Sequence, residues 1–122
     1  MITRIVMLRL KDAFRNEADI DAIARPTGEV FEQSALIKGF SIGRPSDVHT
    51  KREWQLLFCL QFRDQHTLEA WRSSGLYRIL FDQFLAPMRL RVRATNWELA
   101  MTTECELWNE GLLPVERSTI DS

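Results

Sequence analysis

The segment "EWQLLFCLQFRD" (residues 53–64) decides the fold, because large apolar residues occupy every second position along it. A β-strand sends alternate side chains to opposite faces of its sheet. One face of this segment is therefore wholly apolar and predicts a strand packed on the core, whereas the other mixes polar and apolar residues. The expected core face holds Trp54, Leu56, Phe58, Leu60 and Phe62, and the opposite face holds Gln55, Leu57, Cys59 and Gln61.

Three further segments read as strands around this central one. "RIVMLRLKD" (4–12) is largely apolar on both faces, "LIKGFSIGRP" (36–45) turns at Gly39 and runs as a short strand, and "MRLRVRATNWEL" (88–99) follows a proline. Two helical stretches separate them. Asn16 is placed to cap the first, and Pro26 inside it predicts a kink or two short helices. The polar residues 46–53 predict a loop.

The second helical stretch begins after Asp64, a suitable N-cap, and carries Leu68 and Trp71. "SSG" (73–75) interrupts it, and a new segment starts at Ser74. The predicted order is thus β-α-β-β-α-β. Short connections and right-handed crossovers place both helices on one side of a four-stranded antiparallel sheet, which is the α+β, ferredoxin-like arrangement.

Composition describes an ordinary globular chain with a net charge of −1 and no apolar run long enough to span a membrane. We expect one domain over residues 1–100 and a C-terminal extension over 101–122. The extension has apolar residues in its first part, which we expect to pack on something, such as a second subunit. Cys59 and Cys105 read as reduced thiols of a cytoplasmic protein. No His or Cys has a partner at ligand spacing, so neither a metal nor another cofactor is expected.

The last strand carries Arg89, Arg91 and Arg93 at alternate positions, on the sheet face that the helices leave open. Residues of the first and third strands make the middle of that face apolar, so it is poorly suited to water. We therefore predict a homodimer with the open sheet faces together. The arginines would lie at the rim of this dimer, with their stems as packing surface, or would form an anion-binding row.

Four stretches, "RIVMLRLKD", "KGFSIGR", "LQFRDQHTLEAWRSSGLYRILF" and "RATNWEL", resemble the stress-responsive A/B barrel (Dabb) family over residues 2–99, in spacing more than in identity. The resemblance implies a dimeric α/β barrel built from ferredoxin-like protomers. Most members have no assigned activity. One plant member is a cofactor-free polyketide cyclase whose acid–base chemistry depends on histidines.

At the positions that resemble those family histidines, this chain has other residues. The slot in the first strand falls on Arg4, a slot in the third strand falls on Leu56, and Ser74–Tyr77 replaces a His-Pro-x-His motif. None of these residues titrates near neutral pH. The cyclase mechanism is therefore not carried over, and whether the protein is an enzyme stays open.

The remaining candidate site combines Arg4, Leu56, Trp71 and Tyr77 between the sheet and the helices. Arg4 would hold a carboxylate or enolate, Tyr77 would donate a hydrogen bond to it, and Trp71 would form an apolar wall. The corresponding function is binding, and perhaps transformation, of a small aromatic or hydrophobic acid. The alternatives are that these residues are core, with a homodimer whose role is structural, or an RNA-binding module. RNA binding is disfavoured because the first and third strands offer the open face no aromatic residue on which bases could stack.

Overall fold

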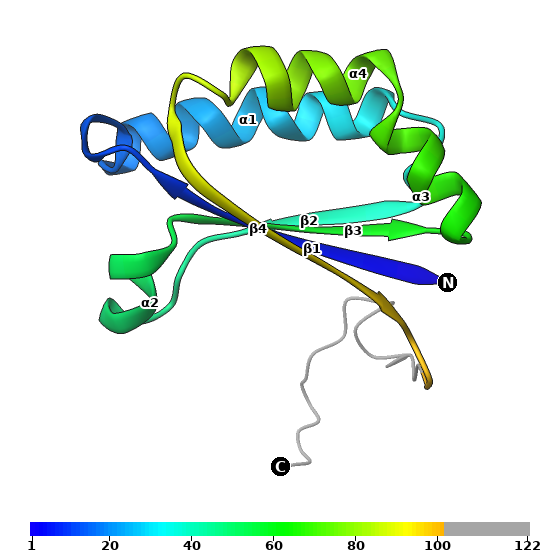
Figure 1. The fold of residues 1–122 in the computed structure, drawn as a ribbon. Helices are drawn as coiled ribbons and strands as arrows, with labels where there is room; N and C mark the ends of the chain where they lie inside the picture. Colours follow the sequence, from blue (N-terminus) through cyan, green and yellow to red (C-terminus); the bar gives the residue numbers. More distant parts are fainter. Residues whose placement is uncertain (102–122) are drawn as a thin grey trace, which may run out of the picture.

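The computed structural model describes residues 1–101 as a single antiparallel sheet of four strands in the order β2-β3-β1-β4 (Figure 1). Apart from a short helix between the second and third strands, the elements follow the predicted order, which confirms the α+β, ferredoxin-like expectation. The strands are β1 (Ile2–Leu10), β2 (Gly39–Gly43), β3 (Leu56–Phe62) and β4 (Arg89–Glu98). The helices are η1 (Asp12–Phe14), α1 (Glu17–Gln33), α2 (Val48–Glu53), α3 (Gln65–Arg72), α4 (Gly75–Tyr77) and the π-helix η2 (Arg78–Phe84) that continues α4.

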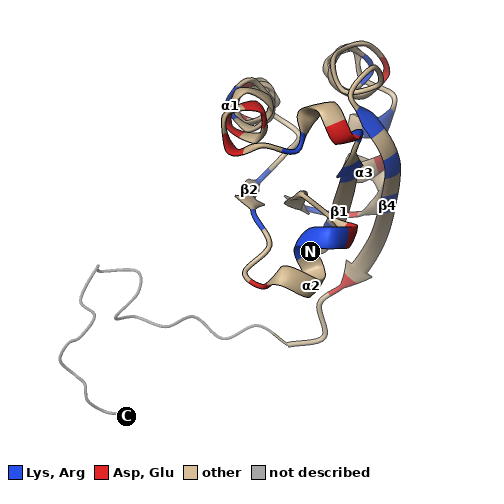
Figure 2. Ribbon diagram, turned by 90° about the vertical axis from the view of Figure 1, so that its left-hand side faces the viewer, with Lys and Arg blue, Asp and Glu red and all other residues tan. Residues whose placement is uncertain are grey.

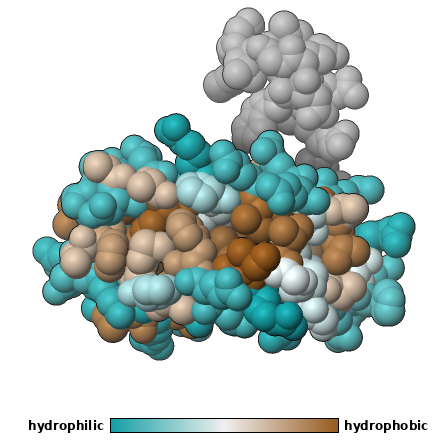
Figure 3. All heavy atoms as spheres, turned by 90° about the horizontal axis from the view of Figure 1, so that it is seen from above, coloured by the Kyte–Doolittle hydropathy of each residue, from teal (hydrophilic) through white to brown (hydrophobic). Residues whose placement is uncertain are grey.

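Helix α1 and the helix that α4 and η2 form together cover one face of the sheet, and the short helix α2 lies on the other side (Figure 1). Between sheet and helices lies one core, to which alternate residues of β1 and β3 contribute. Seen from the helix side, apolar atoms form a band between hydrophilic margins (Figure 3). The most deeply buried side chains include Leu8, Leu10, Phe31, Phe58, Phe62 and Trp71.

The first helix is one uninterrupted element across Pro26, so the alternative of two short helices is wrong. Asn16 caps it as expected, because its side-chain oxygen accepts the backbone N–H of Asp19 at 2.8 Å. Pro26 lacks an N–H and leaves the carbonyl of Ala22 without its helical donor. Ala22 is exposed, so water can satisfy that carbonyl. Packing of the buried face of α1, including Phe31, holds the helix together across the proline.

Residues 48–53 form the helix α2, so the expected loop over 46–53 is also wrong. The Asp47 side chain accepts the backbone N–H of Thr50 at 2.7 Å, which is an N-cap. The polarity of residues 46–53 predicts a loop, but it does not reveal this local hydrogen bond, which stabilises a helix. As a consequence, the chain enters β3 from a helix on the open side of the sheet.

That entry reverses the predicted faces of two residues. Trp54 is only half-buried and faces the open side, whereas Gln55 is 1% exposed. Gln55 accepts the N–H of Leu10 at 2.7 Å and donates to the carbonyl of Lys51 at 2.8 Å. From Leu56 onward the predicted alternation holds, and all even-numbered residues of β3 are buried. The strand thus begins two residues later than the sequence pattern indicates.

The expectations for the extension, including packing by Leu107 and Trp108, concern residues outside those that the structure describes. Among the described helices, none combines the length and the apolar character that crossing a bilayer requires.

Candidate functional site

Arg4 lies in β1 on the helix side of the sheet and is 7% exposed. Its Nη1 donates to Oδ1 of Asn96 at 2.8 Å, on the neighbouring strand. No carboxylate within residues 1–101 forms an ion pair with it. Burial lowers the pKa of Arg4, and the nearby charge of Arg72 lowers it further, while the Tyr77 side chain opposes both effects. Arginine stays protonated throughout the physiological range, so a buried positive charge remains.

The second helical region brings two aromatic side chains to this charge. Asp64 caps α3 by accepting the N–H of Thr67, and Ser74 caps α4 by accepting the N–H of Tyr77, as the sequence indicates. The rings of Trp71 and Tyr77 meet edge to face with centroids 5.7 Å apart. Trp71 is fully buried, and its indole N–H has no hydrogen-bond partner among the described residues.

The chain widens into a π-helix directly after Tyr77, with a hydrogen bond from the N–H of Leu85 to the carbonyl of Leu80. Such widened turns are rare and are often found at functional sites. Tyr77 stacks on Phe81 of this segment, with centroids 4.7 Å apart. The phenol is thereby held beside Trp71 and Arg4.

Of the four predicted pocket residues, the structure brings Arg4, Trp71 and Tyr77 together and separates Leu56 from them. Leu56 pairs with Leu8, whereas Arg4 pairs with Leu60 on the same strand. Four residues along a strand correspond to about 13 Å. Leu56 is 1% exposed and belongs to the other end of the core.

Arg72 is a member of this site that the sequence reasoning missed. It follows the buried Trp71 in the last turn of α3 and lies near enough to lower the pKa of Arg4. A cavity of about 390 Å³ is lined by Glu69, Arg72, Ser73 and Tyr77. Tyr77 therefore connects the buried guanidinium to a solvent-facing hollow beside α3. The only available signal was a basic residue adjacent to a tryptophan.

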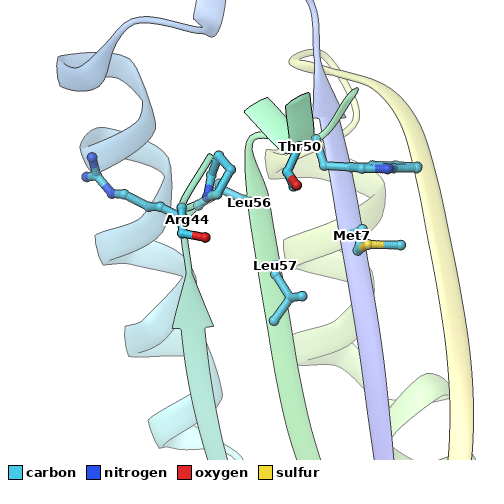
Figure 4. A pocket seen from close by; sticks show the side chains of 8 residues that line it. Met7, Arg44, Thr50, Leu56 and Leu57 are labelled. Carbon is cyan, nitrogen blue, oxygen red and sulfur yellow. The ribbon is translucent and has the colours of Figure 1, made fainter. Parts of the chain in front are cut away.

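A second cavity, of about 210 Å³, lies on the open side of the sheet beneath α2 (Figure 4). Met7 and Leu57, which are register partners, form its floor, and Trp54 and Thr50 come from the entry to β3. Its remaining lining residues are Arg44, Pro45, Ser46 and Leu56. Arg44 is engaged elsewhere, since it pairs with Glu17 and Asp21 of α1.

The three arginines of β4 do not share one environment. Arg93 is opposite Met7 and Arg91 is opposite Arg9, both on the open face, but a register shift places Arg89 opposite the core residue Leu10. The guanidinium carbon of Arg91 lies 5.8 Å from the centroid of the Trp54 ring. Figure 2 shows the basic residues along β4.

Within residues 1–101, no three His, Cys, Asp or Glu side chains are grouped so that they could hold a metal ion. No family model and no curated protein matches the sequence of the chain.

Solved structures do match its fold. A dabb family protein with a ferredoxin-like fold from Mesorhizobium loti superimposes with a TM-score of 0.69 at 13% identity, over 80% of this chain and 95% of that one. A protein from Bacteroides fragilis, described as dimeric and of unknown function, superimposes with a TM-score of 0.65 at 13% identity, over 80% of this chain and 95% of that one. Hydroxynitrile lyase from Passiflora edulis superimposes with a TM-score of 0.69 at 15% identity, over 84% of this chain and 96% of that one.

These likenesses are structural. They agree with the fold that the resemblance to the stress-responsive A/B barrel family predicts. The protein therefore has the ferredoxin-like fold of a dabb family protein and of dimeric relatives, as the resemblance predicted.

Proposed function

We propose that the protein is a homodimer that binds a small hydrophobic organic acid, with the carboxylate of the acid at Arg4. The observation that carries the proposal is a buried guanidinium with no carboxylate partner among the described residues. Tyr77, whose side chain acts on this guanidinium, also contacts Trp71, whose indole N–H has no partner among these residues. Burying a charge without a counter-charge is costly, because its hydration is lost and nothing replaces it. A bound carboxylate would supply the missing acceptor and the missing charge.

The surrounding groups narrow the ligand class. Tyr77 and Trp71 offer aromatic surface beside Arg4, which suits an apolar body attached to the carboxylate. Glu69 lies across the adjoining cavity and would repel a second negative group, so a monocarboxylate is favoured over a diacid. A ligand reaches Arg4 from this cavity once the Tyr77 ring moves aside.

The proposed dimer joins the open sheet faces of two copies. Ile5, Met7 and Leu57 keep this face apolar at its centre, and two of these lie at the floor of the open-side cavity. An exposed apolar sheet face of this kind is typical of an association surface. The relative from Bacteroides fragilis is described as dimeric, which supports the same assembly here.

The proposal is confined to binding and names no reaction. Both histidines, His49 in α2 and His66 in α3, are exposed and stand outside the Arg4 group. We also propose a cytoplasmic location, in keeping with the free thiol of Cys59. A homodimer with a purely structural role is the alternative that the binding experiment distinguishes.

The experiment is a titration of the protein with benzoate, phenylacetate and hexanoate, followed by calorimetry and by the melting temperature. Each acid is paired with its neutral alcohol. We expect the acids to bind more tightly than the alcohols, and we expect Arg4→Met to remove this preference for hexanoate, the acid that has no aromatic ring. Arg78→Met, an exposed change on the following segment, is the matched control and should bind normally. Equal binding of acids and alcohols, or no binding of either, would overturn the proposal.

A further inference from the structure

The open side of the sheet carries an excess of positive charge beside an apolar cavity. The strand residues that face this side include Arg9, Arg91 and Arg93. No strand residue on this side is Asp or Glu. Glu53 is the one carboxylate recorded in contact with these arginines in the described part, and it pairs with Arg9 at 3.6 Å. Arg91 rests on the Trp54 ring, and Arg93 makes no ion pair with any described residue.

The cavity next to these arginines has a fixed wall, because the buried polar side chain of Gln55 holds the segment that forms it. The two hydrogen bonds of Gln55 hold the backbone of β1 and the end of α2 together, and this turns the adjacent Trp54 toward the cavity. Without this turn, the alternation of β3 would place Trp54 in the core. The fold therefore presents the Trp54 ring on the open side. Met7 and Leu57 line the same cavity (Figure 4).

We propose that this cavity is a second binding site, for a flat aromatic anion of one or two rings. Its ring system lies against Trp54, Met7 and Leu57, and its acidic group lies between Arg91 and Arg93. The cavity of about 210 Å³ is smaller than the roughly 300–1,000 Å³ of pockets for drug-sized ligands, which limits the ligand to this size. The site is separate from Arg4, which lies on the other face of the sheet.

An anion fits this position better than the bare face of a second copy does. In a two-fold interface the same patch faces itself, so the arginines of one copy would approach those of the other. Like charges brought together across an interface are unfavourable. An anion bound in each copy would neutralise Arg91 and Arg93. In the proposed dimer these anions are therefore enclosed between the two sheets.

The test uses the full-length Arg4→Met protein, so that the site at Arg4 contributes nothing, and 2-naphthoate as the probe. Binding is followed by quenching of tryptophan fluorescence and by calorimetry, with 2-naphthalenemethanol as the neutral analogue. We expect 2-naphthoate to bind at least tenfold more tightly than the alcohol. Arg93→Gln should weaken the binding of 2-naphthoate at least fivefold. Arg89→Gln is the matched control and should leave it unchanged, because Arg89 stands outside this pair.

A cavity-filling variant, Leu57→Trp, is expected to abolish binding while keeping the far-ultraviolet circular dichroism of the parent. The competing occupant of the cavity is a side chain of the second copy. In that case the affinity for 2-naphthoate falls as the protein concentration rises through the dimerisation range, and the proposal is wrong. Equal affinity for acid and alcohol, or retained binding in Leu57→Trp, overturns it as well. None of these results depends on whether Arg4 binds a carboxylate.

Discussion

The side-chain oxygen of Gln55 accepts the backbone N–H of Leu10 at 2.7 Å, and both residues are fully or almost fully buried. This hydrogen bond ties the end of β1 to the start of β3. It also places Trp54, the residue before Gln55, on the opposite side of the sheet from the core. One buried amide thus determines where the regular alternation of β3 begins.

Replacing Gln55 by Leu should destabilise the protein by about 1–3 kcal/mol, because the N–H of Leu10 would be left buried without an acceptor. The measurement is urea-induced unfolding of Gln55→Leu and the parent. Gln65→Leu is the control, since Gln65 is exposed and makes only a 3.3 Å contact with Glu69. If Gln55→Leu were as stable as the parent, the amide would not be fixing this junction.

The strand pattern of the sequence was sufficient for the topology, because period-two alternation in β3 survives from Leu56 to Phe62. The pattern failed at Trp54, where apolar character favoured the core. A tertiary hydrogen bond to Leu10, distant in sequence, decides the position instead. Nothing local to residues 53–56 specifies that partner. The helix α2 was missed for a related reason, because the cap by Asp47 is visible only as one residue in a polar run.

The candidate site was recovered in part because side-chain parity is a reliable guide within a regular strand. The alternation of side chains along the first strand predicts that Arg4 lies on the helix side, and helical spacing predicts that Trp71 and Tyr77 lie near each other. The alternation of side chains says which face a residue lies on but not how far along the sheet it lies. Leu56 was therefore wrongly grouped with Arg4, Trp71 and Tyr77. The register β1–β3, which separates Leu56 from Arg4, is a property of the assembled sheet.

Replacing Arg4 by Met should raise the free energy of unfolding by about 1–4 kcal/mol, while removing the binding of hexanoate. An apolar side chain of similar volume avoids the cost of a buried, unpaired charge. The measurement is the denaturation midpoint of Arg4→Met beside Arg78→Met, whose exposed arginine should give no gain. A clear loss of stability in Arg4→Met would mean that the bond to Asn96 is sufficient to satisfy the guanidinium.

Acid should weaken the protein through its helix caps. Hydrogen bonds from Thr67 hold the pKa of Asp64 below its usual value, and hydrogen bonds from Thr50 do the same for Asp47. A carboxyl whose pKa is lower in the folded state stabilises the fold above its unfolded pKa of about 3.9. That contribution is lost as the pH falls through 3.9 toward the lower folded value.

Urea unfolding between pH 6 and pH 3 measures this dependence. In Asp64→Asn, the amide oxygen still accepts from the helix but does not titrate, so the fall in stability below pH 5 should be shallower than in the parent. Asp82→Asn is the control, since the Asp82 carboxylate is exposed and forms no ion pair with any residue of 1–101. An identical pH profile for Asp64→Asn and the parent would contradict the assignment.

The proposed dimer predicts that a charge on the open face separates the subunits. Ile5→Lys places a cation at the centre of that face, opposite Cys59 and Thr95, and sedimentation should show a folded monomer. Ile79→Lys, at a position 51% exposed on the π-helix, should leave the dimer intact. Should Ile79→Lys and not Ile5→Lys dissociate the protein, the contact would lie on the helix side instead.

The continuity of α1 predicts that Pro26→Ala stabilises the protein. Alanine restores the N–H that the carbonyl of Ala22 lacks, and in a helix interior proline is about 3 kcal/mol less favourable than alanine. Proline also restricts the unfolded chain, which offsets about 0.4–1 kcal/mol of that gain. Pro87→Ala, in the exposed turn before β4, is the control and should give no gain. An unchanged or lower midpoint for Pro26→Ala would mean that α1 is interrupted at Pro26 in solution, which is one of the two forms that the sequence pattern predicts.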